Sequence, residues 1–152
     1  MPYKKEFDIA SKSFDFAKDL QYGQTGEESI VSFYNSVIQG SAEIKTDRYR
    51  NGRMVVETNQ NPKNKVDELG QRIWDLSGIN VTTAKWWIYI YCLNHSVVVI
   101  SVERLKKYLR SHKDKYNEQS KVIFAQNSDN PAKGFLIEPH DVIQMLYSNE
   151  YD

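Results

Sequence analysis

Charged residues occupy alternate positions in the segment AEIKTDRYRNGRMVVE, residues 42–57. Glu43, Lys45 and Asp47 fall on one side of a predicted strand, because successive side chains of a strand point to opposite faces. Glu57 closes the apolar run that follows. Carboxylates can hold divalent cations for phosphodiester hydrolysis, and a nearby lysine can orient or deprotonate the attacking water. The segment predicts a metal-dependent phosphodiesterase site, and the plainer alternative is a solvated strand face.

A further carboxylate belongs to the helix predicted just before this segment, over residues 22–40, with Thr25 as its N-cap and Gly40 at its end. The apolar stripe of this helix consists of Ile30, Val31, Tyr34, Val37 and Ile38. Counting back along the stripe puts Glu27 on the same inward face. The plainer explanation of Glu27 is an acid that stabilises a helix N-terminus.

A β-hairpin is predicted over residues 42–57, with Asn51-Gly52 as its turn signal. A two-residue loop would pair Asp47 with Val56. A loop one residue longer would pair Asp47 with Glu57 and bring Asn59 opposite Lys45. The longer loop is favoured, because it gathers the polar residues on one face.

The rest of the chain predicts a mixed α/β domain with a central sheet. A buried strand is predicted in KWWIYIYCL, a second strand in SVVVIS, and short strands in KVIFAQ and KGFLIEP. VERLKKYLRSHKDK predicts a basic amphipathic helix with Leu105, Tyr108 and Leu109 inward, and HDVIQMLYS predicts a closing helix. A short helix is also considered around VDELGQRIW.

These segments resemble the small nucleases of the PD-(D/E)XK, or restriction-endonuclease-like, superfamily. The segments that carry the resemblance are GEE, AEIKTDRYRNGRMVVE and SGINVTTAKWWIYIY. Within the superfamily, the chain looks most like the compact phage-encoded members and the Holliday-junction resolvase branch. In that superfamily a helix glutamate precedes a sheet that carries an acid and then an acid-x-Lys pair. Glu27 matches the helix acid, and Glu43 with Lys45 matches the acid-x-Lys motif.

The chain departs from the superfamily in one respect. Members of the superfamily carry an aspartate upstream of acid-x-Lys, whereas the corresponding stretch here, FYNSVIQGSA, contains no acid. In one arrangement Glu43 takes its place, Glu57 is the second-strand acid and Lys45 is a displaced lysine. In the other, Glu43 and Lys45 are the pair as written, and Asp47 or Glu27 completes the metal shell. The departure also supports the alternative function, a catalytically inactive nucleic-acid- or protein-binding module on the same fold.

The resemblance implies a restriction-endonuclease-like α/β fold, with a central mixed β-sheet flanked by helices, as a single nuclease-like domain over residues 1–152. It implies a phage-encoded, Mg²⁺-dependent (or Mn²⁺-dependent) endodeoxyribonuclease that hydrolyses DNA phosphodiester bonds. The implied catalytic residues are Glu27, Glu43, Lys45 and Glu57, and the implied metal ligands are Glu27, Glu43, Asp47 and Glu57. A homodimer is a further expectation, since cutting two strands needs two sites.

Two groups of basic residues are candidates for phosphate contact. Arg48, Arg50 and Arg53 surround the predicted turn, and Lys106, Lys107 and Arg110 lie on the basic helix. The plainer explanations are a charged strand edge that resists aggregation and a solvated helix face.

Composition limits the other function classes. The net charge of the 152 residues is zero, which argues against a polycation that coats nucleic acid. A single cysteine, Cys92, permits no intramolecular disulfide and no cysteine-rich zinc site. No signal peptide or membrane-length apolar run is recognised, so the sequence predicts a soluble protein of the cytoplasm (the host cytoplasm if viral) with no membrane partner.

Overall fold

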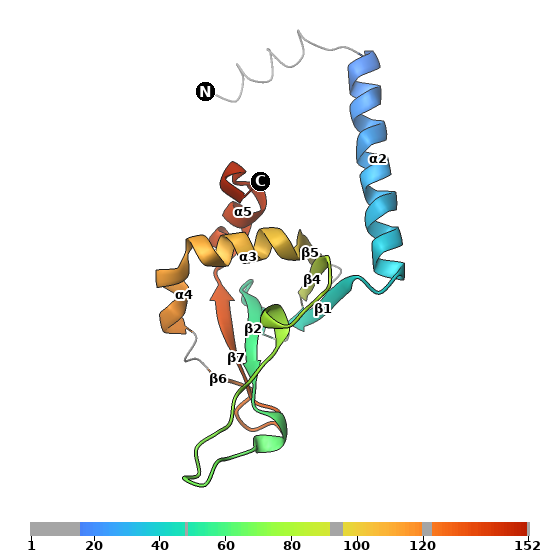
Figure 1. Ribbon diagram of the computed structural model, residues 1–152. Helices are drawn as coiled ribbons and strands as arrows, with labels where there is room; N and C mark the ends of the chain where they lie inside the picture. The colour runs from blue at the N-terminus through green and yellow to red at the C-terminus, as the bar shows by residue number, and fades with distance from the viewer. Residues whose placement is uncertain (1–15, 48, 92–95, 120–122, 152) are drawn as a thin grey trace. The chain divides into compact units, whose positions relative to one another are not determined.

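The computed structural model describes residues 16–47, 49–91, 96–119 and 123–151. The chain divides into two compact units, Met1–Gln39 and Gly40–Asp152. In its described part the first unit is a single helix, and the second contains every described strand (Figure 1).

Helix α2 (Phe16–Ile38) begins well before the predicted N-cap. Thr25 lies inside the helix, where its Oγ1 donates to the carbonyl oxygen of Gln21 at 3.0 Å. The predicted cap is therefore wrong: the Thr25 hydroxyl hydrogen-bonds a carbonyl of the preceding helical turn and does not cap the start of a helix. The predicted end is confirmed, since the helix stops at Ile38 and Gly40 follows with a left-handed φ of 77°.

Sheet A contains β1 (Ala42–Asp47), β4 (Trp86–Tyr91) and β5 (Ser96–Ser101), in the order β1-β4-β5. β1 runs parallel to β4, which places Lys45 beside Tyr89, and β5 is antiparallel to β4. The aromatic and β-branched residues of β4 and β5 favour extended backbone. Both predicted strands are confirmed.

Sheet B contains β2 (Met54–Gln60), β3 (Asp75–Leu76), β6 (Ile123–Phe124) and β7 (Ala132–Ile137), in the order β3-β2-β7-β6 with antiparallel neighbours. β1 and β2 thus lie in different sheets, and the predicted hairpin is wrong. The chain does turn where predicted, with positive φ at Arg50 and Gly52. Pairing of β2 with β7 lets Met54 and Val56 become fully buried, which an isolated two-stranded ribbon would not achieve.

The predicted C-terminal helices are confirmed as α3 (Val102–Ser111), α4 (Lys113–Gln119) and α5 (Pro139–Tyr147). The basic helix divides at His112, which is the C-cap of α3. Short 3₁₀ segments are η1 (Pro62–Asn64), η2 (Gly78–Asn80) and η3 (Asn149–Tyr151). The short helix considered around residues 66–74 is wrong, because the Asp67 carboxylate accepts from the backbone N–H groups of Leu69 and Gln71 and closes a turn instead.

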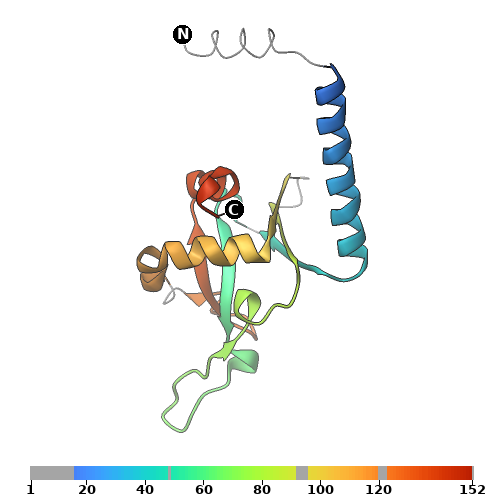
Figure 2. The same cartoon turned by 45° about the horizontal axis from the view of Figure 1, so that its top comes forward.

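One hydrophobic core joins both sheets to α3 and α5. Figures 1 and 2 show α3 crossing over β2 and β7. Arg104 fastens α3 to the end of α5, because its Nε donates to the carbonyl of Met145 at 3.0 Å and its guanidinium also reaches the carbonyl of Ser148 at 2.5 Å. The largest fully buried side chains include Trp87, Tyr108, Tyr116, Met54, Leu105, Ile137 and Met145.

The protein therefore has an α/β fold, as predicted. Its described strands are shared between two sheets, where the sequence predicts one central sheet.

Buried tyrosines should make the fold sensitive to alkali. Burial raises the pKa of Tyr116 far above the ordinary range, and its hydrogen bond to Tyr108 adds to this shift. The unfolded chain releases such protons near pH 10 while the folded chain retains them, so stability is present below about pH 10 and falls above it. Denaturant unfolding between pH 8 and pH 11 should show this fall, and Tyr116→Phe should make it shallower. The same slope in wild type and variant would contradict this assignment.

Candidate functional site

The inward face of β1 carries the charged residues. Glu43 and Lys45 are half-buried and Asp47 is 4% exposed, whereas Ile44 on the other face is 55% exposed. The predicted alternation is therefore confirmed, with the apolar residue outside and the charges inside. Charged groups on an inward face need partners or access to water, so this face requires a chemical explanation.

A cavity of about 370 Å³ lies against this face. Lys45 and Asp47 of β1, Tyr89 of β4 and Glu57 of β2 all contribute to its wall. The rest of the lining comes from Thr46, Tyr49, Val55, Phe124, Ala125, Ser128, Asn130 and Ala132. Two sheets and the connection between β6 and β7 thus bring a lysine and two carboxylates to one space.

Glu43 positions the lysine of this group. The Lys45 Nζ lies 2.8 Å from Glu43 Oε1, and it also stands 5.8 Å from the centroid of the Trp87 ring. The hydroxyl of Thr82 donates to Glu43 Oε2 at 3.4 Å. Glu43 is therefore held between Lys45 and Thr82 rather than standing as a separate cavity ligand.

Asp47 is the most buried charged residue of the group. Its Oδ1 accepts from the backbone N–H of Tyr49 at 3.0 Å. Burial raises the pKa of the Tyr89 hydroxyl well above its usual value, and the neighbouring Asp47 carboxylate adds to this effect. Burial and then Asp47 raise the pKa of Tyr91 in the same way. Tyr89 therefore presents a neutral hydroxyl beside an acidic group at ordinary pH.

Glu57 is fixed by its neighbours on both sides. Its Oε1 accepts from the Ser77 hydroxyl at 2.7 Å. A Cβ at Gly78 would lie 2.2 Å from the Glu57 carbonyl oxygen, and a Cβ at Gly134 would lie 2.9 Å from the Glu57 Cα. The pairing of β2 with β7 then shifts register between Glu57 and Asn59. Such a bulge re-aims neighbouring side chains, and here it stands beside Glu57.

The remaining predicted site residues include Glu27 and the arginines around the turn. Glu27 is an exposed residue of α2, in the first unit, whereas the other acids are in the second. Arg48 lies outside the described residues. Arg50 is exposed with a φ of 51°, and Arg53 Nε lies 2.9 Å from Glu138 Oε1, so Arg53 already has an acidic partner.

The inward direction predicted for Glu27 is wrong for a physical reason. The spacing of apolar residues predicts that this segment is a helix. The same spacing does not show whether the apolar stripe faces the core or solvent. In α2 the stripe residues Ile30, Tyr34 and Ile38 are themselves exposed. Sharing a face with them therefore does not bury Glu27.

The basic residues of α3 do not line this cavity. Lys107 Nζ lies 3.7 Å from Glu103 Oε1, and Lys106 and Arg110 have no acidic partner among the described ion pairs. Alternation along β2 and β7 places Glu57 on one face of sheet B and Phe135, with α4 packed on it, on the other. The predicted phosphate contacts are thus divided between separate surfaces.

The donor set of the cavity fits one kind of metal ion. Mg²⁺ is often held by one or two carboxylates together with water and phosphate oxygens, and Asp47 and Glu57 could supply such a pair. Within the described ranges, no three His, Cys, Asp or Glu side chains are grouped as a ready-made metal centre. The cavity therefore suits a largely hydrated ion better than a cage of protein ligands.

Sequence reasoning missed the residues that support the acids. Tyr89 is predicted only as part of a buried strand, and no role is predicted for Ser77 or Gly78. Alternation along β4 could have identified Tyr89, because Tyr89 lies beside Lys45 once β1 and β4 are paired. That pairing joins segments more than 40 residues apart, and nothing local in the sequence specifies it.

No protein-family model, curated protein or solved structure matches this chain. In the described part of the chain, every helix is too short or too polar to cross a lipid bilayer.

Gly78→Ala should disturb Glu57 through direct contact. Both the left-handed φ of 52° and the approach to the Glu57 carbonyl oppose a side chain there, so the free energy of unfolding should fall by more than about 2 kcal/mol. Gly70→Ala is the matched control, because Gly70 has a φ of 76° but an added methyl group would meet nothing within 4 Å. Denaturant unfolding of both variants measures the difference. Equal losses would mean that the contact with Glu57 is unimportant.

Proposed function

We propose that the cavity is the active site of a Mg²⁺- or Mn²⁺-dependent endonuclease that hydrolyses DNA phosphodiester bonds. The observation that carries the proposal is the meeting of Lys45, Asp47 and Glu57 around one cavity. These residue types supply metal-binding oxygens and a cation for phosphate. They come from strands of two sheets, so their meeting is a property of the fold and not of one sequence segment.

Each residue has a distinct role in this proposal. Asp47 and Glu57 would hold the ion, which when bound activates a water and neutralises charge on the leaving oxygen. Lys45 orients the water and attracts the phosphate, and Glu43 positions the Lys45 ammonium through the 2.8 Å ion pair. Tyr89 contributes to the wall of the same cavity as a neutral phenol beside Asp47. Glu43 as a ligand would require that ion pair to open, and Glu27 stays a prediction from sequence.

The restriction-endonuclease-like fold, the phage-encoded nuclease family and the homodimer belong to this proposal. Their support is the acid-x-Lys motif on the inward face of β1, next to the buried aromatic strand β4. Arg50, exposed at the turn after β1, is the arginine that we assign to DNA phosphate beside the cavity.

Cleavage assays test the proposal directly. Supercoiled plasmid, linear duplex and a four-way junction would be incubated with the full chain in Mg²⁺, Mn²⁺ or EDTA. We expect metal-dependent cutting that falls by at least about 100-fold in Lys45→Ala, Asp47→Asn and Glu57→Gln. Glu68→Gln, at an exposed loop position, is the matched control and should cut like wild type. Failure of folded wild type to cut any substrate would refute the enzyme assignment.

Metal binding has a readout that does not need cleavage. Mn²⁺ at 100 times its dissociation constant should stabilise the folded chain by about 2.7 kcal/mol. The doubly substituted Asp47→Asn/Glu57→Gln chain should lose this gain, and Glu68→Gln should keep it. Thermal unfolding with Mn²⁺ and with EDTA provides the measurement, and a gain retained by the double variant would place the ion elsewhere.

A second candidate is a binding module that has lost catalysis. It is favoured by the partners that the charged groups already have, since Glu43 binds Lys45, Glu57 accepts from Ser77 and Asp47 accepts from Tyr49. The missing upstream aspartate of the superfamily points the same way. This candidate predicts neither cutting nor stabilisation by Mn²⁺, so the two experiments above separate it from the nuclease.

A further inference from the structure

A second cavity lies away from the candidate active site, between α3, α4, η2 and β7. We call it the α3 groove, and its volume is about 530 Å³. It is lined by Ile79, Asn80, Lys106, Leu109, Arg110, Lys113, Tyr116 and Phe135. Phe135 pairs with Val56 whereas Gly134 pairs with Glu57, so the groove and the candidate site use opposite faces of sheet B.

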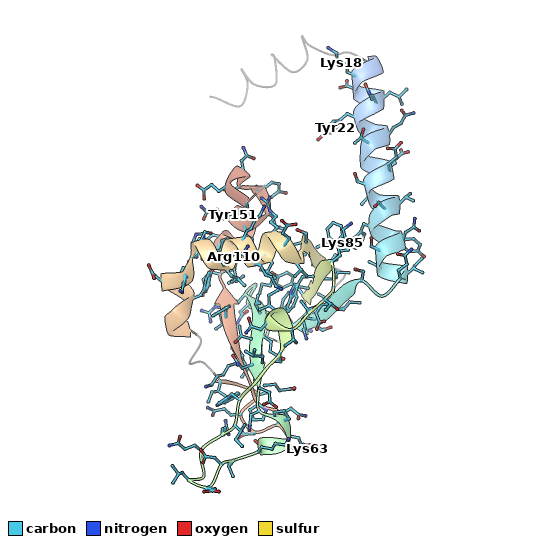
Figure 3. The ribbon with its side chains drawn as sticks, viewed as in Figure 1. Lys18, Tyr22, Lys63, Lys85, Arg110 and Tyr151 are labelled. Atoms are coloured by element: carbon cyan, nitrogen blue, oxygen red, sulfur yellow. The ribbon has the colours of Figure 1, made fainter. Side chains whose placement is uncertain are left out.

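One rim of the α3 groove is strongly basic. Lys106 and Arg110 lie one helical turn apart on α3, and Lys113 is the first residue of α4, directly after the break at His112; all three line the groove. Among the described residues, none of these three cations has a carboxylate within ion-pair distance. Their neighbours differ, since Lys107 pairs with Glu103 and Lys115 pairs with Asp141. Figure 3 labels Arg110 on α3, where its exposed side chain extends from the helix.

The floor of the α3 groove is apolar and aromatic. The rings of Tyr116 and Phe135 lie 5.5 Å apart between centroids, and Leu109 and Ile79 extend this surface. The Tyr116 hydroxyl is occupied by its 2.7 Å hydrogen bond to Tyr108. Tyr116 is only 1% exposed, so its ring packs behind Phe135, and the accessible apolar surface comes from Phe135 and Leu109.

Asn80 adds a polar group at the edge of this floor. Its Nδ2 donates to the carbonyl of Thr58 at 3.0 Å, which fixes the amide and leaves Oδ1 as a hydrogen-bond acceptor. A ligand that matches the α3 groove thus needs an anionic group, a flat apolar body and a hydrogen-bond donor on that body. The volume is in the range of small-ligand sites.

We propose that the α3 groove binds a single 5′-phosphorylated nucleotide, with its base on Phe135 and its phosphate at Lys106, Arg110 and Lys113. Bases stack on aromatic side chains, and arginine and lysine bind phosphate oxygens. The nucleotide is either free or the unstacked 5′ end of a DNA strand. The site needs neither metal nor cleavage, so it stands independently of the proposed nuclease.

Calorimetric titration of the full chain in EDTA tests this site. The probes are deoxyadenosine monophosphate, deoxyadenosine, inorganic phosphate, and a short single-stranded oligonucleotide with or without a 5′-phosphate. The monophosphate should bind at least about tenfold more tightly than deoxyadenosine or phosphate, because it engages both rim and floor. Tighter binding of the 5′-phosphorylated oligonucleotide than of the monophosphate would identify a strand end as the source, and the reverse would identify the free nucleotide.

Substitutions assign the binding to the groove. Lys106→Gln/Arg110→Gln and Phe135→Leu should each weaken monophosphate binding by at least about tenfold. Lys107→Gln, one residue away on α3 but outside the groove, should not change it, and Lys45→Ala should not either. Circular dichroism and unfolding confirm that each variant is folded.

Several results would overturn the proposal. These are the absence of monophosphate and oligonucleotide binding, equal affinity for inorganic phosphate and for the monophosphate, and binding that Lys45→Ala abolishes while the groove variants retain it. The proposal would also be overturned if oligonucleotide affinity were unchanged by removal of the 5′-phosphate and by Phe135→Leu. Such binding would reflect only charge attraction to the helix surface.

Discussion

The parallel pairing of β1 with β4 is the constraint on which the candidate site depends. β4 is a strand of large aromatic and aliphatic residues, and its Trp87 and Tyr89 are buried in the core. A strand that pairs with β4 in register must turn one set of alternate residues toward that core. In β1 this set is Glu43, Lys45 and Asp47. A shift by one residue would bury Ile44 and Thr46 and move the charges to the outer face.

Burial of this set is tolerable because each charge is compensated in a different way. Glu43 and Lys45 pair with each other while remaining about a third exposed, at 32% and 30%. Asp47 is almost fully buried and accepts a backbone hydrogen bond from Tyr49. Tyr89 faces the same group as a neutral phenol. The inward face is therefore polar but contains no isolated charge, which permits a ligand site beside a packed core.

The sequence predicts local features of this arrangement well and its long-range pairing poorly. Alternation in residues 42–47 depends only on strand geometry, so the shared face of the three charged residues is predictable. The Asn51-Gly52 turn is predictable too, but a turn does not specify which strands pair after it. β2 instead joins β7, about 80 residues later, because Met54 and Val56 need a larger surface to cover them. Asp47 and Glu57 still line one cavity, although the hairpin predicted to bring them together does not exist. Residue type therefore restricts the possible roles, and the contacts made by the fold select among them.

The position of β1 at the edge of sheet A explains how a strand with inward charges can also serve a site. An outer strand of a sheet leaves one side of its backbone and side chains within reach of water. The Glu43–Lys45 pair keeps part of its hydration there, so the pair itself adds only up to about 1 kcal/mol to stability. The same pair in the middle of a sheet would lose its water and add a desolvation penalty of several kcal/mol. Access to water keeps the desolvation penalty of these charges small when the chain folds. A phosphate or a hydrated cation needs the same access to reach them.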